Sequence, residues 1–425
     1  MQKNMCSKKS RMKVLLVYPN LPLQYSLPHS ISTLAGCLKE RHHMVSLFDT
    51  TYYHTMLSDD ERRVQRGQVE PFEMKYVKTT DMYKDFNLLV NRLMPDVIMI
   101  TFVDNTAELG LSLLRSLKKH VFTVAGGVSC ILNPGRFHVP EIDMVYTGTA
   151  EEFTRCAYAM EDFSVFEPER LFRPMGGQWR KTIPFVFDRG CPFNCGFCCA
   201  PALREQFGYH RKTIKQIREE LRFQITKHSP EFLYFSSETF LAMPMLTLET
   251  LAKIYTQYNL PFWCQTHVDT ITKRRAEILR SMNCWRVSIG IECGNEYYRR
   301  LMIGKQFSNK DAVHAFRLLK EQNISAAANN IIGLPFETEE MVKETIRLNQ
   351  VLYSIMPEMQ LNCYIFQPYY GTKLRKLCEE KHILLDKGLG TVQGEPVIHN
   401  PFMSNEKIVW YRDNFHELVT NGGTI

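Results

Sequence analysis

Short apolar runs of strand length alternate along the chain with segments whose apolar positions recur at helical spacing. In the N-terminal third, the strand-like runs are Lys13–Pro19, Val45–Phe48, Asp96–Val103, Val121–Ala125 and Met144–Tyr146. Ser30–His43 and Ala107–Lys119 place apolar residues on one helical face. Strands that alternate with helices form parallel sheets. The pattern predicts an α/β, doubly wound, Rossmann-like domain over residues 1–150, with the polar segment 50–90 as an insertion or lid.

A second series of strands and helices follows. Its strand-like runs are Phe185–Asp188, Phe232–Phe235, Phe262–Gln265, Val287–Ile291, Ala326–Ile331 and Asn362–Phe366. Helical segments lie between them, for example Lys215–Lys227, Arg274–Met282, Asn309–Glu321 and Thr338–Leu352. Six such units predict a partial (βα)6 barrel of the triosephosphate-isomerase kind over residues 184–375, with its active site at the C-terminal strand ends. We expect residues 151–183 to be a connector and residues 376–425 to cap the barrel.

Composition narrows the class of protein. The chain has 425 residues, 44% of them hydrophobic and 23% charged, which is typical of globular domains. No apolar run approaches the ~20 residues that span a bilayer, so we expect no membrane span and a cytoplasmic location. The net charge of +7 comes from 52 basic and 45 acidic residues without a long basic run, so nucleic-acid binding is not indicated.

Four of the thirteen cysteines fall within one short segment, at Cys191, Cys195, Cys198 and Cys199. A cytoplasmic protein does not rely on a disulfide framework. Gly190 and Gly196 permit the tight backbone needed to wrap an ion or a cluster. Cys thiolates hold iron–sulfur clusters, usually four of them. A loop with three ligands would leave one iron of a four-iron cluster open to a substrate or cofactor.

Three other readings of the cysteine segment stay open. Zinc would need a fourth ligand, which Cys199 or His210 would supply. A redox pair at Cys195-x-x-Cys198 belongs to a thioredoxin-like setting at a helix start. Purely structural cysteines are the third alternative, although such residues rarely cluster after the first strand of a barrel.

The spacing C-x-x-x-C-x-x-C, with the aromatic Phe197 before the last cysteine, resembles the radical S-adenosylmethionine (radical SAM) superfamily. The resemblance implies a [4Fe–4S] cluster on Cys191, Cys195 and Cys198, with Cys199 as a bystander. The methionine amino and carboxylate groups of S-adenosylmethionine would chelate the open iron. Reductive cleavage would then give a 5′-deoxyadenosyl radical, with electrons from a donor such as flavodoxin or ferredoxin.

Motifs at later strand ends extend this resemblance over residues 181–375. Ser236-Ser237-Glu238, Gly290-Ile291-Glu292 and Asn330–Pro335 follow the second, fourth and fifth barrel strands, and a proline–glycine turn at 367–372 follows the sixth. The resemblance implies S-adenosylmethionine contacts from Phe197, Ser236, Ser237, Glu238, Glu292, Asn330 and Gly333.

The first domain resembles that of cobalamin-binding radical SAM enzymes. Its matching segments are Lys13–Pro19, Leu34–His43 leading to Asp49, Pro95–Phe102 and Ala125–Ser129. The resemblance implies cobalamin as a further cofactor, with contacts from Asn105, Thr106, Gly126, Gly127 and Ser129. The motif Asp-x-His-x-x-Gly, which supplies a histidine to cobalt, is absent, so an α/β domain without cobalamin stays open. A nicotinamide cofactor is disfavoured because G-x-G-x-x-G does not follow the first strand.

The leading hypothesis is a cobalamin-dependent radical methyltransferase acting on an unactivated carbon, or on phosphorus, of a small-molecule or peptidyl substrate. One alternative keeps the radical chemistry but performs cyclisation, rearrangement or oxidation. The other is a non-catalytic iron–sulfur electron carrier. No catalytic side chain is singled out, since Tyr209, His210, Trp263, His267, Tyr364 and Tyr370 fit packing or solvent-facing roles better than substrate contact.

Overall fold

The computed structural model describes residues 11–386 and 388–422, and the chain divides into two compact units. The first unit comprises Met1–Asp60 and Glu73–Arg173, and the second comprises Glu61–Phe72 and Pro174–Ile425. Among the described residues, none of the helices combines the length and apolar character that a bilayer-spanning segment requires.

The first unit is built on a parallel sheet with the strand order β2-β1-β3-β4-β5. Its strands are β1 (Lys13–Tyr18), β2 (Met44–Asp49), β3 (Val97–Thr101), β4 (Thr123–Gly126) and β5 (Met144–Val145). Its α-helices are α2 (His29–Glu40), α4 (Met82–Leu93), α5 (Ala107–Arg115), α6 (Val128–Leu132) and α7 (Ala150–Thr154), while α3 (Asp59–Gln65) begins in this unit and lies mostly in the second. The predicted Rossmann-like architecture is confirmed, and segment 50–90 contains α3 and most of α4.

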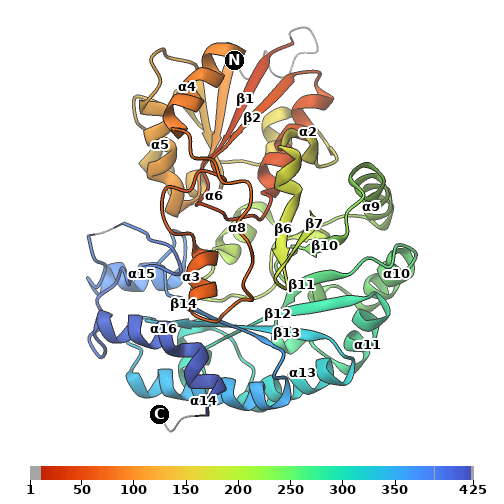
Figure 1. Cartoon of the computed structure of the whole chain (residues 1–425), viewed down its shortest axis with the longest axis vertical. Coiled ribbons are helices and arrows are strands. Elements are labelled where there is room, and N and C mark those ends of the chain that lie inside the picture. The colour runs from red at the N-terminus through yellow and green to blue at the C-terminus, as the bar shows by residue number, and fades with distance from the viewer. Residues whose placement is uncertain (1–10, 387, 423–425) are drawn as a thin grey trace. The chain divides into compact units, whose positions relative to one another are not determined.

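Helices cover both faces of this sheet. One apolar cluster packs Phe86 of α4 and Leu114 of α5 against Leu15 of β1 and Ile98 of β3. Helix α2 contacts β2 from the other side, as Figure 1 shows. The order of the strands reverses at β1, because β1 pairs with β2 on one edge and with β3 on the other. Doubly wound sheets bind ligands at the carboxyl ends of strands at such a switch point.

The second unit contains a seven-stranded sheet with the order β14-β13-β12-β11-β10-β7-β6. Its strands are β6 (Phe172–Met175), β7 (Gln178–Phe185), β10 (Phe232–Phe235), β11 (Phe262–Thr266), β12 (Cys284–Glu292), β13 (Ser325–Ile332) and β14 (Gln360–Ile365). All neighbours from β7 to β14 pair in parallel. This sheet is the predicted partial barrel.

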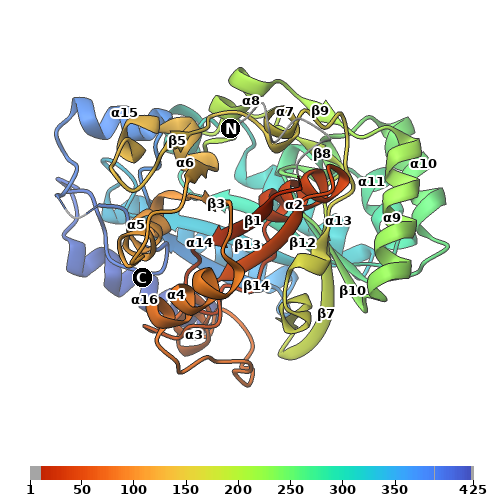
Figure 2. The ribbon, with the colours of Figure 1, turned by 90° about the horizontal axis from the view of Figure 1, so that it is seen from above.

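Helices accompany the strands of the second unit, and some of them pack on the barrel sheet. They are α8 (Ala200–Phe207), α9 (Ile214–His228), α10 (Met245–Tyr255), α11 (Lys273–Ser281), α12 (Glu296–Tyr298), α13 (Asn309–Glu321), α14 (Glu339–Ile355), α15 (Lys373–Glu380) and α16 (Asn405–Thr420). In Figure 2, α9, α10 and α11 lie beside the strands of this unit. The sequence pattern gave examples of these helices and no range for α8, α10, α12 or α15. It also placed the first barrel strand too late, because a turn at Gly176-Gly177 joins β6 to a strand that begins at Gln178.

The open edge of the half-barrel, at β14, is covered by segments distant in sequence. Gln68 bonds to both the amide and the carbonyl of Cys363, each at 3.5 Å. Ile365 donates to the carbonyl of Val392 at 2.8 Å. Covering an edge strand in this way removes a template for pairing with another chain. These contacts explain why residues 61–72 belong to the second unit.

A buried carboxyl closes the turn after β13. Gly333 has a φ of +72°, and its amide donates to Glu337 Oε2 at 2.7 Å, with Leu334 donating to the same oxygen at 3.3 Å. Glu337 is fully buried, and its Oε1 has no hydrogen-bond partner among the described residues. Burial therefore raises the pKa of Glu337 to about 8.

Glu337 makes folding stability depend on pH. The pKa of Glu337 is higher in the folded state than in the unfolded chain. Its contribution to folding stability is therefore complete at pH values below the unfolded-state pKa, and it is lost as the pH rises through about 8. The variant Glu337→Gln keeps a side-chain oxygen that accepts from both amides, and it cannot ionise. At high pH we therefore expect its free energy of unfolding to exceed that of the parent by on the order of 1–3 kcal/mol.

Anaerobic urea denaturation from pH 5 to pH 9 measures this difference. Glu340→Gln, at an exposed position of the following helix, is the matched control and should change neither the stability nor its pH dependence. A loss of stability in Glu337→Gln that is the same at every pH would contradict the assignment.

Candidate functional site

The cysteine segment forms a loop beyond the carboxyl end of β7. Short strands β8 (Asp188–Arg189) and β9 (His210–Arg211) pair antiparallel and join the two ends of the segment. Gly190 adopts a φ of +97°, where an L side chain is strained. Cys191, Cys195 and Cys198 are all partly exposed on this loop, and α8 begins directly after Cys199.

Gly196 attaches the loop to two distant segments. Its amide donates to the carbonyl of Ile303 at 2.8 Å, and its carbonyl accepts from the amide of Leu374 at 2.9 Å. A Cβ at this position would lie 2.8 Å from the carbonyl oxygen of Met302, so only glycine fits. Cys195 and Cys198 are therefore placed by backbone bonds on both sides of the glycine between them.

Arg204 of α8 holds the first half of the loop from within. Its guanidinium donates to the carbonyl of Cys191, to that of Phe193 at 3.3 Å and to Asn194 Oδ1 at 2.6 Å. The carbonyls are satisfied without regular secondary structure, which keeps this half of the loop rigid.

The polar residues after β10 meet the same loop. Ser237 is fully buried, and its Oγ accepts from the amides of Phe187 and Asp188 at 3.1 and 3.3 Å. Glu238 Oε1 accepts from the amide of Gly190 at 3.4 Å. Thr239 Oγ1 lies 3.2 Å from Cys191 Sγ. Of these three, the sequence singled out Ser237 and Glu238 and missed Thr239, for which no periodic or motif signal exists.

The three thiols share a poorly solvated environment. Burial raises the pKa of Cys191, and it raises the pKa of Cys195 to about 12. Among the described residues, no three His, Cys, Asp or Glu side chains are placed to share one metal ion. Ligands of an iron–sulfur cluster each bind a different iron atom. Three thiols on one rigid loop are a donor set that fits such a cluster.

A buried ion pair lies beside the loop. Lys305 Nζ is 2.8 Å from Glu292 Oε1 and donates to the carbonyl of Gly290 at 2.7 Å, and both charged side chains are buried. Burial works to lower the pKa of Lys305, yet the Glu292 carboxylate holds it above its usual value. Gly290 is required here, because a Cβ would lie 2.0 Å from Glu292 Oε1.

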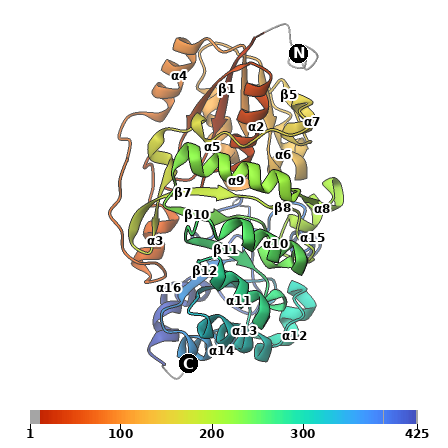
Figure 3. The same ribbon diagram turned by 90° about the vertical axis from the view of Figure 1, so that its right-hand side faces the viewer.

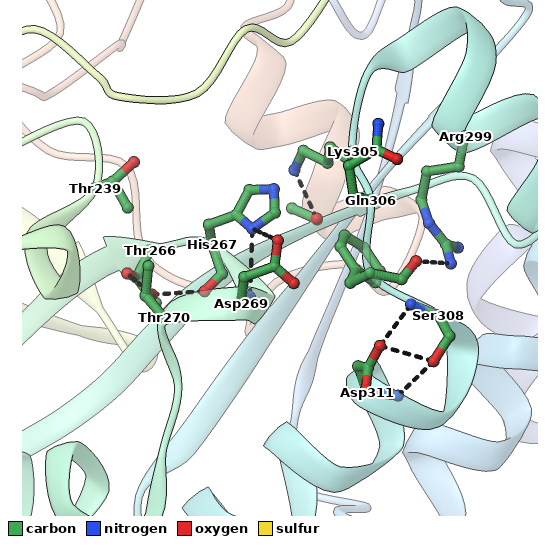
Figure 4. Close-up of polar contacts among 12 residues, drawn as sticks. Thr239, Thr266, His267, Asp269, Thr270, Arg299, Lys305, Gln306, Ser308 and Asp311 are labelled. Carbon is green, nitrogen blue, oxygen red and sulfur yellow. Dashed lines mark hydrogen bonds and ion pairs between the residues drawn. The ribbon is translucent and has the colours of Figure 1, made fainter.

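His267 packs against the loop from the end of β11. Its ring stacks on Phe193 with centroids 3.9 Å apart and planes 10° apart, and Figure 4 shows it between Asp269 and Lys305. Its Nδ1 accepts from the amide of Asp269 at 3.3 Å. Burial, together with the charges of Lys305 and Arg299, lowers the pKa of His267 to about 3, so the ring is neutral at physiological pH.

The structure does not bring every predicted contact to the loop. Asn330 is buried between β13 and α14, where its amide exchanges two hydrogen bonds with that of Asn349 at 2.7 and 3.1 Å. A Cβ on Gly333 would lie 2.9 Å from Ile408 of α16. Phe197 packs in an apolar cluster with Leu334 and Phe366. Glu292 uses Oε1 for Lys305, and Ser236 is half-buried after β10.

Two of the predicted cobalamin contacts lie on the first unit's 3-10 turn Asp104–Thr106, beyond the carboxyl end of β3, and the other three lie around the end of β4. Gly127 has a φ of +96°, and a Cβ there would lie 2.5 Å from Thr101 Oγ1, whereas at Gly126 the nearest atom would be 3.9 Å away. Ser129 donates to Asp104. Thr106 Oγ1 is buried and has no hydrogen-bond partner among the described residues. Asn105 is half-buried beside it.

Comparison with known proteins agrees with this geometry. Residues 185–348 match the model of the radical SAM superfamily, whose members bind a [4Fe–4S] cluster and S-adenosylmethionine. These residues form a radical SAM domain, which contains the cysteine loop and the segments around it.

Two curated relatives are similar over part of the chain. An uncharacterised methyltransferase, PH0819, of Pyrococcus horikoshii is 26% identical over 218 residues, which are 50% of this chain and 46% of that protein. The anaerobic magnesium-protoporphyrin IX monomethyl ester cyclase of Rubrivivax gelatinosus is 26% identical over 191 residues, which are 44% of this chain and 33% of that protein. The matches span less than half the length of these relatives.

A solved structure shares the fold over almost the whole chain. TsrM of Kitasatospora setae, a radical S-adenosylmethionine methyltransferase with cobalamin and a [4Fe–4S] cluster bound, aligns with a TM-score of 0.60. The alignment covers 95% of this chain and 85% of that chain at 14% sequence identity. At this identity the likeness establishes the fold.

Removing one loop cysteine is expected to abolish cluster assembly. Cys195→Ala or Cys198→Ala should lower bound iron after anaerobic reconstitution from about four atoms per chain to less than about one. Cys199→Ala is the matched control from the same loop and should retain the iron of the parent. Iron and sulfide analysis checks both, and loss of the cluster in Cys199→Ala would contradict the ligand assignment.

Breaking the Lys305–Glu292 pair is expected to destabilise the second unit. Lys305→Met leaves a buried carboxylate without its cation, which costs about 3–5 kcal/mol of unfolding free energy. The double variant Lys305→Met/Glu292→Leu removes both charges and should recover most of that loss. Urea denaturation of the reconstituted protein measures both, with the exposed Lys310→Met as control. Equal destabilisation of the single and double variants would show that the pair itself is not the cause.

Proposed function

From the radical SAM domain that residues 185–348 form, we propose that this chain is a cobalamin-dependent radical S-adenosylmethionine methyltransferase. Its substrate is an unactivated carbon, or a phosphorus, of a small molecule or peptide. One observation carries the proposal. The same chain holds a loop of three cysteines at the carboxyl end of a half-barrel's first strand and a parallel sheet with a glycine-containing carboxyl edge.

In the second unit, Cys191, Cys195 and Cys198 would hold the [4Fe–4S] cluster. When bound, the cluster supplies the electron that cleaves the sulfonium of S-adenosylmethionine and so generates the reactive radical. The chain's own residues keep this loop in one conformation, through Gly196 on both sides and Arg204 from within. Preorganisation of this kind is what a protein adds to cofactor chemistry.

Around the loop, Glu238 is the strongest candidate among the predicted S-adenosylmethionine contacts. It accepts from Gly190 at the start of the loop, and its neighbour Thr239 lies beside Cys191. A carboxylate in this position can receive hydrogen bonds from the amino group of a ligand on the open iron. Asn330 and Gly333 support the barrel instead, through their contacts with α14 and α16.

In the first unit, the residues present fit cobalamin. Gly126 leaves the carboxyl edge open to a close approach, and the buried hydroxyl of Thr106 lacks a partner there among the described residues. When bound, cobalamin supplies a methyl group carried on cobalt. The shared fold with TsrM, which binds cobalamin, supports this assignment.

A second candidate function has specific support. The similarity to the anaerobic magnesium-protoporphyrin IX monomethyl ester cyclase supports ring closure as an alternative to methyl transfer. The methyltransferase hypothesis is preferred because PH0819, which is named a methyltransferase, matches 50% of this chain by sequence, whereas the cyclase matches 44% of it.

The test is made on anaerobically reconstituted protein supplied with hydroxocobalamin and freed of excess. Stoichiometric corrinoid, 5′-deoxyadenosine formed with dithionite, and transfer of label from methyl-labelled S-adenosylmethionine to bound cobalamin would together support the methyltransferase. Deoxyadenosine without corrinoid would leave a radical enzyme of the second kind. A cluster without deoxyadenosine would indicate an electron carrier.

Gly126→Leu is expected to block cobalamin without unfolding the first unit. Its side chain would project into open space at the carboxyl edge, since the nearest atom to a Cβ is 3.9 Å away. We expect at least a tenfold loss of corrinoid affinity, which corresponds to about 1.4 kcal/mol, with an unchanged melting temperature. Gly135→Leu, where a Cβ meets nothing within 4 Å, is the control. Full corrinoid binding by Gly126→Leu would place the cofactor elsewhere.

A further inference from the structure

The cluster loop lies between two exposed segments of the second unit. Gly196 is bonded through its amide to Ile303, at the end of the π-helix Arg299–Ile303, and through its carbonyl to Leu374, in the first turn of α15. Figure 3 shows α8, α12 and α15 along the same side of this unit. Side chains on these segments are therefore among the surface groups nearest to Cys195.

The π-helix side of this surface is apolar. Tyr297 is 74% exposed and Leu301 is 65% exposed. They stand four positions apart, so they lie on one face of the helical turn. Leu301 directly precedes Met302, whose carbonyl oxygen is 2.8 Å from the Cβ position of Gly196. Large apolar side chains at this exposure, gathered next to a functional loop, mark an interaction site.

The α15 side of the surface is basic. Lys373 and Lys376 are exposed and flank Leu374. Arg375 is held in an ion pair with Glu379 at 2.6 Å, so the acidic end of the helix is partly neutralised. On the opposite segment, Arg300 is exposed beside Leu301 and lies 3.5 Å from a carboxylate oxygen of Glu296, so its charge is partly neutralised. The exposed side chains of Lys373 and Lys376 therefore form a basic patch on α15, next to the apolar pair on the π-helix side.

We propose that Tyr297, Arg300, Leu301, Lys373 and Lys376 form the docking surface for an acidic electron-carrier protein that reduces the cluster. This inference rests on the proposed function, because it requires a cluster that must be reduced. An apolar patch beside a patch of exposed positive charge is an arrangement by which an acidic partner docks transiently and quickly. Electron-transfer encounters need only a small contact area of this kind.

The transfer at this surface is a single-electron step. One electron leaves the reduced flavin or iron–sulfur centre of the carrier, which is oxidised by one electron, and the cluster is reduced by one electron. No bond forms or breaks, and no proton needs to move. The chain's contribution is to bring the carrier within reach of Cys195 through Gly196, Ile303 and Leu374.

The proposal is tested by comparing reduction by a carrier protein, which needs docking, with reduction by dithionite, which does not. The variants are Lys373→Glu/Lys376→Glu and, separately, Leu301→Ser. The control is Arg218→Glu/Arg222→Glu on α9, a helix that packs against β7 and α10. Formation of 5′-deoxyadenosine is measured with a bacterial flavodoxin kept reduced by its NADPH-dependent reductase, and again with dithionite. Calorimetry gives the affinity of flavodoxin for each reconstituted protein at about 0.05 M and about 0.3 M salt.

We expect the double lysine variant to lose about tenfold in flavodoxin-driven rate and in affinity at low salt, with the dithionite-driven rate and the control unchanged. An unaltered flavodoxin-driven rate overturns the proposal. A fall with both reductants also overturns it, since the residues would then act on the cluster or the fold. So does sedimentation showing that the parent, and not the variant, pairs with a second copy of itself. If dithionite yields no deoxyadenosine even with the parent, the proposed function fails, while the flavodoxin affinities still decide the docking surface.

Discussion

The backbone bonds of Gly196 are the constraint on which the cysteine site depends. The glycine stands between Cys195 and Cys198, and its amide and carbonyl reach two segments that lie far along the chain. A loop of this length would otherwise be mobile, because loops carry few contacts of their own. Since a Cβ would meet the carbonyl of Met302, the close approach that makes both bonds possible requires glycine.

The buried Lys305–Glu292 pair gives the same region its electrostatic character. The attraction between two buried charges offsets their desolvation cost only when the pair is close and further hydrogen bonds are made to the charged groups. Here the carbonyl of Gly290 accepts one such bond from Lys305. The pair also acts on the loop, since the charge of Lys305 lowers the pKa of Cys195 while burial raises it. A fixed cation beside thiolate ligands favours their ionised form, which is the form that binds iron.

The two units divide the proposed chemistry between them. The half-barrel supplies a rigid thiol loop with a neutral histidine stacked on it, and the Rossmann-like unit supplies a carboxyl edge with an open glycine and a buried hydroxyl. Both sites lie at the carboxyl ends of parallel strands, where backbone groups and loops converge without disturbing the core. A flexible loop arrangement could not offer such fixed geometry to two cofactors.

Much of this was determined by the sequence alone. The alternation of apolar runs with helical periodicity located both sheets, because burial on two faces demands continuous apolar strands. Local spacing was sufficient to predict that Cys191, Cys195 and Cys198 lie close together, since a single loop carries all three. Ser237 and Glu238 were also found, because they directly follow a strand whose end faces that loop.

Tertiary structure alone decided the rest. Lys305, Thr239 and Arg204 reach the loop from separate elements, and Asn330 turns away from it toward Asn349 of α14. Which face of a strand a side chain occupies depends on register, and a shift of one residue reverses it. The start of β7 was also missed, because the glycine turn that joins β6 to β7 looks in the sequence like the end of a regular element. Contacts between residues distant in sequence leave no periodic signal, so only the folded chain reveals them.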